Sequence, residues 1–410
     1  MEMKRKQFPR KSAGQQEVLK ELDKIGGMNL HYRDGRILNS ICSEPLDIAL
    51  LAYEKMIASN LGDARLFPGM VQMEQDVVSM LGDLLHNDRA AGNVVTGGTE
   101  ANLLAMYVAR RIGEEKGIEA PEIVASESIH FSFHKACTFL NIKLITIKTD
   151  SQFRISSKEI ENAITPNTIA IVATAGTSET GTVDPIEVMA GIAREQQLYF
   201  HVDAASGGFL LPFMEDAGYP SVIFDFMLEG VHSITVDPHK YGLSVIPSGF
   251  ILFRDQKLQD YIQFPSFFHG TKAHTTFSGT RTGAGLASVY AVIHSMGYEG
   301  FVEKTKSIMK KRTLLVDELW KRGIQTLGRP DLNIIMIQSR NPLVMMEQLE
   351  KNGWIASVSR RYDALRVVVH HHNSEERLME FSETVSQLER TIVSKSRSIK
   401  GDIEIAGERE

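Results

Sequence analysis

The sequence predicts an α/β protein with a mostly parallel seven-stranded sheet in a large domain and a small C-terminal α+β domain. Two observations carry this prediction. Between residues 61 and 299, short apolar runs alternate mostly with helical patterns, as in a parallel sheet covered by helices. From residue 300 the pattern changes to short strands and helices. A chain of 410 residues is long enough for both units.

The N-terminal segment, residues 1–60, is predicted to be helical, chiefly in QQEVLKELDKIG and LDIALLAYEKMIASN. In the large domain, residues 61–299, the last two apolar runs lie too close together for a helical crossover, so we expect them to pair antiparallel. The seven predicted strands are GNVVTGG, PEIVASES, IKLITIKT, IAIVATAG, LYFHVDAA, HSITVDPH and SGFILFRD.

The small domain, residues 300–393, follows the long helical pattern GYEGFVEKTKSIMKKRTLLVDELWKRG. Its predicted strands are NIIMIQS, WIASVSR and ALRVVVHHH, and its helices are NPLVMMEQLEKNG and SEERLMEFSETVSQLERTIVSK. Residues 394–410 are highly charged and are predicted to form a flexible tail.

Composition excludes several classes of function. A formal net charge of −6 gives no electrostatic basis for binding nucleic acid or an anionic membrane. The two cysteines, Cys42 and Cys137, cannot form a disulfide framework, and such usage is typical of the reducing cytoplasm. No uncharged apolar run approaches 18 residues, and the basic N-terminus lacks the apolar stretch of a signal peptide.

Lys240 occupies an unusual place, between two runs that both read as interior strands in SITVDPHKYGLSVIPSGFILF, residues 233–253. Lysine is among the residues least often fully buried. One interpretation is a turn lysine that points into water. The other is an amine held in a pocket to react with a carbonyl, since a desolvated lysine readily loses its proton and becomes a nucleophile.

Other candidates follow predicted strands at their carboxyl ends, where ligands bind in open parallel sheets. The turn Thr96–Thr99 contains two glycines at a helix start and suits a phosphate, although it matches neither the Walker nor the GxGxxG motif and could be purely structural. Asp203 could cap a turn or pair with a buried cation. His130 alone would more often be structural. After IVATAG, small residues leave room for a flat group.

Together these parts specify pyridoxal 5′-phosphate (PLP). The lysine forms a Schiff base with the cofactor, and the carboxylate keeps the pyridine nitrogen protonated so that the ring takes up electrons. The imidazole stacks on the ring, and the Gly-Gly-Thr turn holds the phosphate. Each element alone is a weak signal, whereas all four in this order are a strong one.

Several motifs resemble the group II PLP-dependent decarboxylases, and most closely the archaeal L-tyrosine/L-aspartate decarboxylases. The resemblance extends over about residues 20–390. It is carried by LHYRDGRILNSICSEP, NLGDARLFPG, TGGTEAN, HFSFHKA, AGTSETGTVDPI, HVDAASGG, DPHKYGLSVIPSG, SGTRTG and ALRVVV.

The resemblance implies PLP fold-type I (aspartate aminotransferase-like) and a homodimer whose active sites straddle the interface. It implies that Lys240, His130 and Asp203 are catalytic, and that Arg366 and His130 bind the substrate carboxylate. Gly279 and Thr280 would reach the partner's phosphate. The cofactor-binding set implied in this way is Gly98, Thr99, His130, Thr177, Asp203, Ala205, His239, Lys240, Gly279 and Thr280.

One segment departs from the family pattern. Many relatives carry a tyrosine before the Gly-Thr-Arg segment that can protonate the substrate carbon, but FPSFFHGTKAHTTFSGTR has none. His269, Lys272 and His274 are the titratable candidates there. We favour one of the two histidines because imidazole titrates closest to neutral pH. Residues 264–281 are expected to form a mobile lid.

The implied function is α-decarboxylation of an L-amino acid, with tyrosine giving tyramine and aspartate giving β-alanine for methanofuran and coenzyme A synthesis. Glutamate is a further substrate to consider. A carbon–carbon lyase acting on a phosphorylated sphingoid base shares the HKYG signature, but no membrane anchor is visible. A non-catalytic PLP-binding protein is the other alternative, although such a protein has no need of the intact Lys240, Asp203 and His130.

Three consecutive histidines, His370, His371 and His372, invite a metal-site interpretation. We predict no metal there, because successive residues of a strand point to opposite faces and no Cys, Asp or Glu ligand spacing lies nearby.

Overall fold

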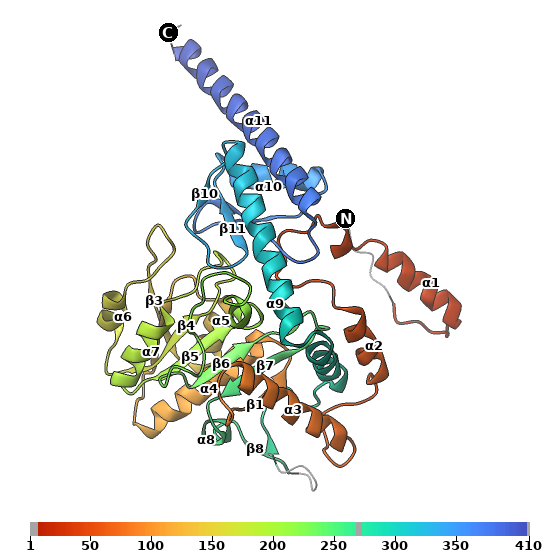
Figure 1. Ribbon diagram of the computed structural model, residues 1–410, viewed down its shortest axis with the longest axis vertical. Helices are drawn as coiled ribbons and strands as arrows, with labels where there is room; N and C mark the ends of the chain where they lie inside the picture. Colours follow the sequence, from red (N-terminus) through yellow and green to blue (C-terminus); the bar gives the residue numbers. More distant parts are fainter. Residues whose placement is uncertain (1–6, 268–272, 408–410) are drawn as a thin grey trace.

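The computed structural model describes residues 7–267 and 273–407, with side chains as far as residue 394. Figure 1 shows a broad α/β body and a smaller C-terminal unit, with the long helix α9 (Gly283–Lys321) running from one to the other. Two helices project from the molecule: α1 (Gln15–Gly26) at one side and α11 (Glu375–Gly407) at the end.

The large sheet has seven strands in the order β1-β7-β6-β5-β4-β2-β3, one for each predicted apolar run. The five strands from β6 to β3 are parallel, and β7 is antiparallel to both of its neighbours. The predicted antiparallel pair is therefore confirmed. The strands are β1 (Ala91–Val95), β2 (Glu122–Ser126), β3 (Lys143–Ile147), β4 (Thr168–Thr174), β5 (Tyr199–Ala204), β6 (Ser233–Val236) and β7 (Gly249–Phe253).

Helices cover both faces of this sheet, and a separate apolar cluster lies on each face. Every residue of β4 and β5 is buried, which explains why these strands read as continuous apolar runs rather than as an alternating pattern. The helices of the body are α2 (Asp47–Lys55), α3 (Pro68–Leu84), α4 (Gly98–Glu115), α5 (Phe131–Leu140), α6 (Ser157–Ala163), α7 (Ile186–Glu195) and α8 (Gln256–Asp260).

The small C-terminal unit is an antiparallel sheet in the order β10-β11-β13-β12, packed against α10 (Pro342–Lys351) and α11. The N-terminal segment joins this unit, because Ile37 bridges to Ile355 and Leu38 is fully buried in its apolar cluster. The strands are β10 (Thr326–Leu327), β11 (Ile334–Ile337), β12 (Ser357–Ser359) and β13 (Ala364–Val368).

The structure differs from the sequence prediction at a few places. Helix α9 begins at Gly283, well before the predicted start, and is interrupted at Gly297. The short strand β10 was not predicted. The predicted lid contains a small hairpin of β8 (Phe264–Pro265) and β9 (Ala273–His274). Helix α11 continues to Gly407, into the segment predicted to be a flexible tail.

Within the described part of the chain, the helices are all too short or too polar to cross a membrane.

Candidate active site

A cavity of about 420 Å³ opens beyond the carboxyl ends of β4, β5 and β6. Ligands of open parallel sheets bind at this edge. Most of the predicted site residues line this cavity, although they come from segments far apart in the sequence. Its lining includes Gly98, Thr99, His130, Asp203, Ala205, His239 and Lys240.

Lys240 belongs to the interior of the molecule. It lies in the turn after β6, where its backbone N–H donates to Asp237 O, and its side chain is only 17% exposed. Its Nζ lies 3.1 Å from Asp237 Oδ2. Burial lowers the pKa of Lys240, but Asp237 and Asp203 outweigh this and raise it above the ordinary value. The interpretation as a solvated turn lysine is therefore wrong.

Asp203, near the end of β5, is held by two donors. Its Oδ1 accepts from the backbone N–H of Ala205 at 3.1 Å, and its Oδ2 accepts from Asn102 Nδ2 at 3.0 Å. Asn102 comes from α4 and is itself fixed, because its Oδ1 accepts from Thr235 Oγ1 at 2.8 Å. A buried carboxylate with fixed donors is suited to pairing with one cationic group at a fixed place.

His130 is the N-cap residue of α5 and accepts from the backbone N–H of Ser132 through Nδ1. Ser132 Oγ also lies 2.9 Å from Nδ1. Because Nδ1 accepts, the hydrogen of the neutral ring is assigned to Nε2. Burial lowers the pKa of His130, which favours this neutral form.

The start of α4 fits a phosphate group. A Cβ added at Gly97 would lie 2.9 Å from His239 Cε1, and one added at Gly98 would lie 2.9 Å from Asp237 Oδ2 and 3.1 Å from Ala205 Cβ. Both positions therefore need glycine for space. The helix that begins at Gly98 directs its positive dipole end into the cavity, where an anion is stabilised.

Thr177 is the predicted cofactor residue that the structure places differently. Its side chain is fully buried and lies 2.6 Å, between hydroxyl oxygens, from Thr180 and 3.4 Å from Thr182. Its neighbours Gly176 and Ser178 line the cavity instead. Thr177 therefore does not line the cavity in this structure, and its role as a cofactor residue stays a prediction.

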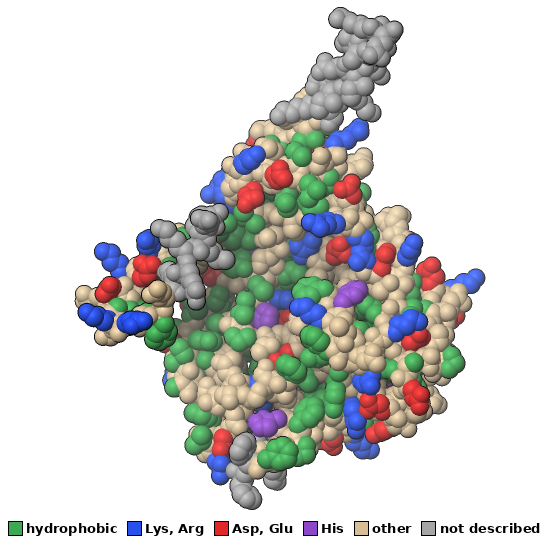
Figure 2. Space-filling view, turned by 180° about the vertical axis from the view of Figure 1, so that it is seen from behind, with side chains coloured by type: hydrophobic (Ala, Val, Ile, Leu, Met, Phe, Trp, Pro, Cys, Tyr) green, Lys and Arg blue, Asp and Glu red, His purple; other side chains and the backbone are tan. Residues whose placement is uncertain are grey.

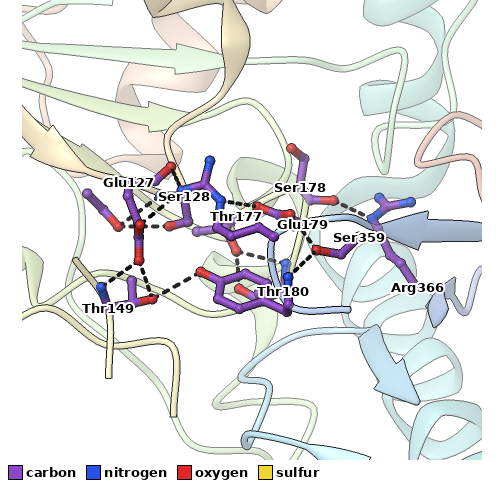
Figure 3. Close-up of polar contacts among 12 residues, drawn as sticks. Glu127, Ser128, Thr149, Thr177, Ser178, Glu179, Thr180, Ser359 and Arg366 are labelled. Carbon is purple, nitrogen blue, oxygen red and sulfur yellow. Dashed lines mark hydrogen bonds and ion pairs between the residues drawn. The ribbon is translucent and has the colours of Figure 1, made fainter. Parts of the chain in front are cut away.

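Arg366, in β13, does not line the cavity itself but contacts Ser178, a lining residue in the loop that follows β4. Its Nε donates to Ser178 O at 2.7 Å and its Nη1 donates to Asn39 O at 2.9 Å. Figure 3 shows this contact beside a second link between the two units, in which Ser359 Oγ donates to Glu179 Oε1 at 2.6 Å. Among the described residues, no carboxylate pairs with Arg366.

Other predicted residues lie away from this cavity or cannot be placed. Gly279 and Thr280 do not line it, and Ser278 beside them donates its backbone N–H to Glu100 Oε1. His274 lies in β9, opposite Phe264. His269 and Lys272 fall outside the described residues.

His370, His371 and His372 converge, contrary to the prediction that they point to opposite faces. They follow the last residue of β13 in a turn, so the alternation of a strand does not apply. Their ligand nitrogens lie within 4.8 Å of one another. They bond among themselves and to Ser43, with His370 Nδ1 and His371 Nδ1 2.7 Å apart. The absence of a metal there stays a prediction.

Comparison with known proteins now identifies the family. Residues 39–329 match the family described as "Pyridoxal-dependent decarboxylase conserved domain". The chain belongs to this family. It is a pyridoxal-dependent decarboxylase, and its cofactor is PLP. Gly98, Asp203, His130 and Lys240 around one cavity fit that cofactor.

Similar proteins agree with this assignment. A "Probable L-tyrosine/L-aspartate decarboxylase" of Methanothermobacter thermautotrophicus is 41% identical over 349 residues, which are 85% of this chain and 95% of that protein. The "L-aspartate decarboxylase" of Thermococcus kodakarensis is 40% identical over 377 residues, covering 91% of this chain and 97% of that protein.

Solved structures show the shared fold. The sphingosine-1-phosphate lyase of Burkholderia pseudomallei superposes with a TM-score of 0.88 at 24% identity, covering 98% of this chain and 96% of that one. The glutamate decarboxylase of Lactobacillus brevis gives 0.83 at 21% identity, covering 93% and 94%. At such identities the likeness shows the fold alone, which is the predicted fold-type I architecture.

Two polar residues of the pyridoxal-dependent decarboxylase site were given no role in the sequence prediction. Asn102 lies inside a helix, and the sequence signal there comes from the glycines of the first turn. Asp237 stands three residues before Lys240, a spacing that a tight turn brings together. Both line the cavity.

Proposed function

We propose that the protein removes the α-carboxylate of an L-amino acid, with L-aspartate as the first substrate and L-tyrosine as the second. The convergence of Lys240, Asp203 and His130 on one cavity carries the proposal. L-aspartate comes first because it stands in the names of the relatives from both Methanothermobacter and Thermococcus.

The roles of the residues follow from their surroundings. When bound, PLP supplies a protonated pyridine ring that takes up electrons as a bond to Cα breaks. Asp203, fixed by Asn102 and Ala205, would hold the proton on the ring nitrogen. His130 would present its Nε2 hydrogen toward the substrate carboxylate. The start of α4 at Gly98, with Thr99 and His239, would hold the phosphate.

Arg366 would bind the carboxylate of the substrate. Burial lowers the pKa of Arg366, yet a guanidinium keeps its charge in proteins. Its bonds to Ser178 O and Asn39 O fix the planar group at the cavity edge without neutralising it. A charged, half-buried guanidinium that pairs with no carboxylate of the described residues favours binding of an anion, and its planar fork matches a carboxylate.

We further propose a homodimer in the cytoplasm. Helix α1 buries none of its residues, and Figure 2 shows hydrophobic side chains in the hollow between this projecting helix and the body. Gly279 and Thr280 do not line the cavity of their own chain, and we expect them to serve a neighbour's site. Both cysteines are free thiols, as suits a reducing compartment. The exposed apolar residues of α1 are Val18, Leu19, Leu22 and Ile25.

The proposal is tested by incubating the PLP-loaded protein with each of the 20 standard amino acids and measuring CO₂ and the amine. Release of both in equal amounts from L-aspartate, and none from a Lys240→Ala protein, is the expected result. Release from L-glutamate alone would change the substrate. If no amino acid yields CO₂ while a phosphorylated sphingoid base yields an aldehyde, the protein is a carbon–carbon lyase.

A further inference from the structure

Asp237 is a second carboxylate that faces Lys240. It lies in the turn after β6, and its Oδ2 is 3.1 Å from Lys240 Nζ. The side chain is only 2% exposed, and its Oδ1 is buried without a hydrogen-bond partner among the described residues. His239 Nε2 lies 3.6 Å from Oδ2. His130 and Cys42 are further titratable groups that interact electrostatically with both Asp237 and Lys240.

The backbone around Asp237 keeps its carboxylate in place. A Cβ at Gly98 would lie 2.9 Å from Oδ2, and one at Gly249 would lie 2.6 Å from Oδ1. Glycines at the start of α4 and at the start of β7 therefore leave the space that the carboxylate fills. A larger residue at either position would meet the carboxylate, so both glycines are needed for Asp237 to face Lys240 in this way.

The two carboxylates near Lys240 differ in their partners. Both oxygens of Asp203 accept from fixed donors, Asn102 and Ala205. Asp237 has one oxygen beside the amine and one to which none of the described residues donates. Asp237 is thus the carboxylate with an open oxygen, whereas both oxygens of Asp203 already accept hydrogen bonds.

A paired Lys240 presents a chemical problem that Asp237 can solve. The ion pair favours the ammonium form, and an ammonium has no lone pair with which to attack a carbonyl. Before Lys240 can bond to the aldehyde of the cofactor, a group in contact with Nζ must take a proton from it.

We propose that Asp237 is the proton acceptor and resting partner of Lys240, an inference that rests on the proposed role of Lys240. Asp237 takes one proton from the ammonium, and the freed lone pair attacks the carbonyl carbon. The proton then passes to the departing oxygen. Of the three ammonium protons, two leave in the water and one stays on the nitrogen of the C=N bond. When substrate amine displaces Lys240, the released amine returns to Asp237.

The test is the rate at which the cofactor-free protein takes up PLP, measured by absorbance from pH 6 to pH 10. The substitution Asp237→Asn keeps the shape and removes the charge. We expect the pH at which uptake reaches half its maximum to fall by at least one unit. At pH 10 uptake should be at least tenfold slower than in the wild type. Titration of PLP itself is common to both proteins and cancels in their ratio.

The conservative variant Asp237→Glu restores a carboxylate and should return the midpoint toward that of the wild type. If Asp237→Asn does not fold, as judged by circular dichroism, the smaller Asp237→Ser variant, which also lacks the carboxylate, takes its place. A folded variant without the carboxylate whose midpoint and rate equal those of the wild type overturns the proposal.

Borohydride trapping separates this inference from the proposed function. If the peptide containing Lys240 carries no trapped cofactor in the wild type, the assignment of Lys240 fails. If it carries the cofactor and loads equally fast in the wild type and in Asp237→Asn, only the role of Asp237 fails.

Discussion

Asn102 Nδ2 donates to Asp203 Oδ2 at 3.0 Å and also lies 2.9 Å from Ser132 Oγ, which in turn contacts His130 Nδ1. One amide on α4 therefore orients the carboxylate beneath the predicted ring position and, through Ser132, the imidazole. Both groups are thus linked, directly or through Ser132, to a single side chain that is itself almost completely buried.

We predict that Asn102→Ala weakens PLP binding about tenfold or more, since losing a hydrogen bond to a charged group costs about 1.5–3 kcal/mol. The dissociation constant, measured by fluorescence, checks this. Asn167→Ala, at an exposed position, serves as the control. An Asn102→Ala protein that binds PLP as tightly as the control would show that Asp203 is oriented without the amide.

Lys240 should carry the cofactor. The purified protein is expected to be yellow, and borohydride should fix PLP to this residue, which mass spectrometry of peptides can locate. Lys116, whose Nζ donates to Gln197 O on the surface, is a suitable control lysine. A Lys240→Ala protein that still forms a reducible bond at the wild-type rate would contradict the assignment.

Two inactive subunits should complement each other if the sites are shared. Lys240→Ala lacks the reactive amine, and Thr280→Val lacks the hydroxyl that we expect at the partner's phosphate. Mixed under conditions of verified subunit exchange, they should regain up to about a quarter of wild-type activity, because half of the dimers are mixed and each has one intact site. Absence of recovery would count against shared sites.

The predicted lid should supply the proton that Cα needs after CO₂ leaves. Replacing both His269 and His274 by Phe is expected to slow amine release and, in air, to yield some aldehyde and ammonia instead. His134→Phe, a histidine on α5 that does not line the cavity, is the control. If the double variant makes amine as fast and as cleanly as the wild type, the donor is elsewhere.

Stability should fall on mild acidification because of buried histidines. Burial, with His372 and Lys311 nearby, lowers the pKa of His371 to about 4. Between pH 6.5 and pH 4 the unfolded chain binds a proton at this residue that the folded protein does not. The free energy of unfolding therefore decreases as pH falls through this window, by up to about 1.4 kcal/mol per pH unit for this residue.

Urea unfolding at pH 7 and pH 5 measures this decrease. His371→Asn should make the difference between the two pH values smaller, whereas His31→Asn, at an exposed position, should leave it unchanged. An equal loss of stability in all three proteins would place the effect elsewhere, for example at His201 or His232, whose pKa values burial lowers to about 3 and about 4.

The sequence by itself determined the alternation of strands and helices, the antiparallel pair of β6 and β7, and the candidates Lys240, Asp203 and His130. These depend on local signals: periodicity, turn residues, loop length and a position at the end of a strand. The motifs around these three residues also indicated the protein family. The residues that make up each signal lie close together in the sequence, so the signal can be recognised without the structure.

Only the tertiary structure decided which way side chains turn and what meets them. Thr177 turns into a threonine cluster, and the three histidines converge because a turn replaces the strand after Val368. Asn102 meets Asp203 across 101 positions of sequence. Such contacts depend on how segments that are distant in the sequence pack together. The hydrophobic periodicity of one segment contains no information about which other segment lies beside it. The pairing of Asp237 with Lys240 is the local product of one turn, but the space for the carboxylate comes from glycines of α4 and β7, which lie far away in the sequence.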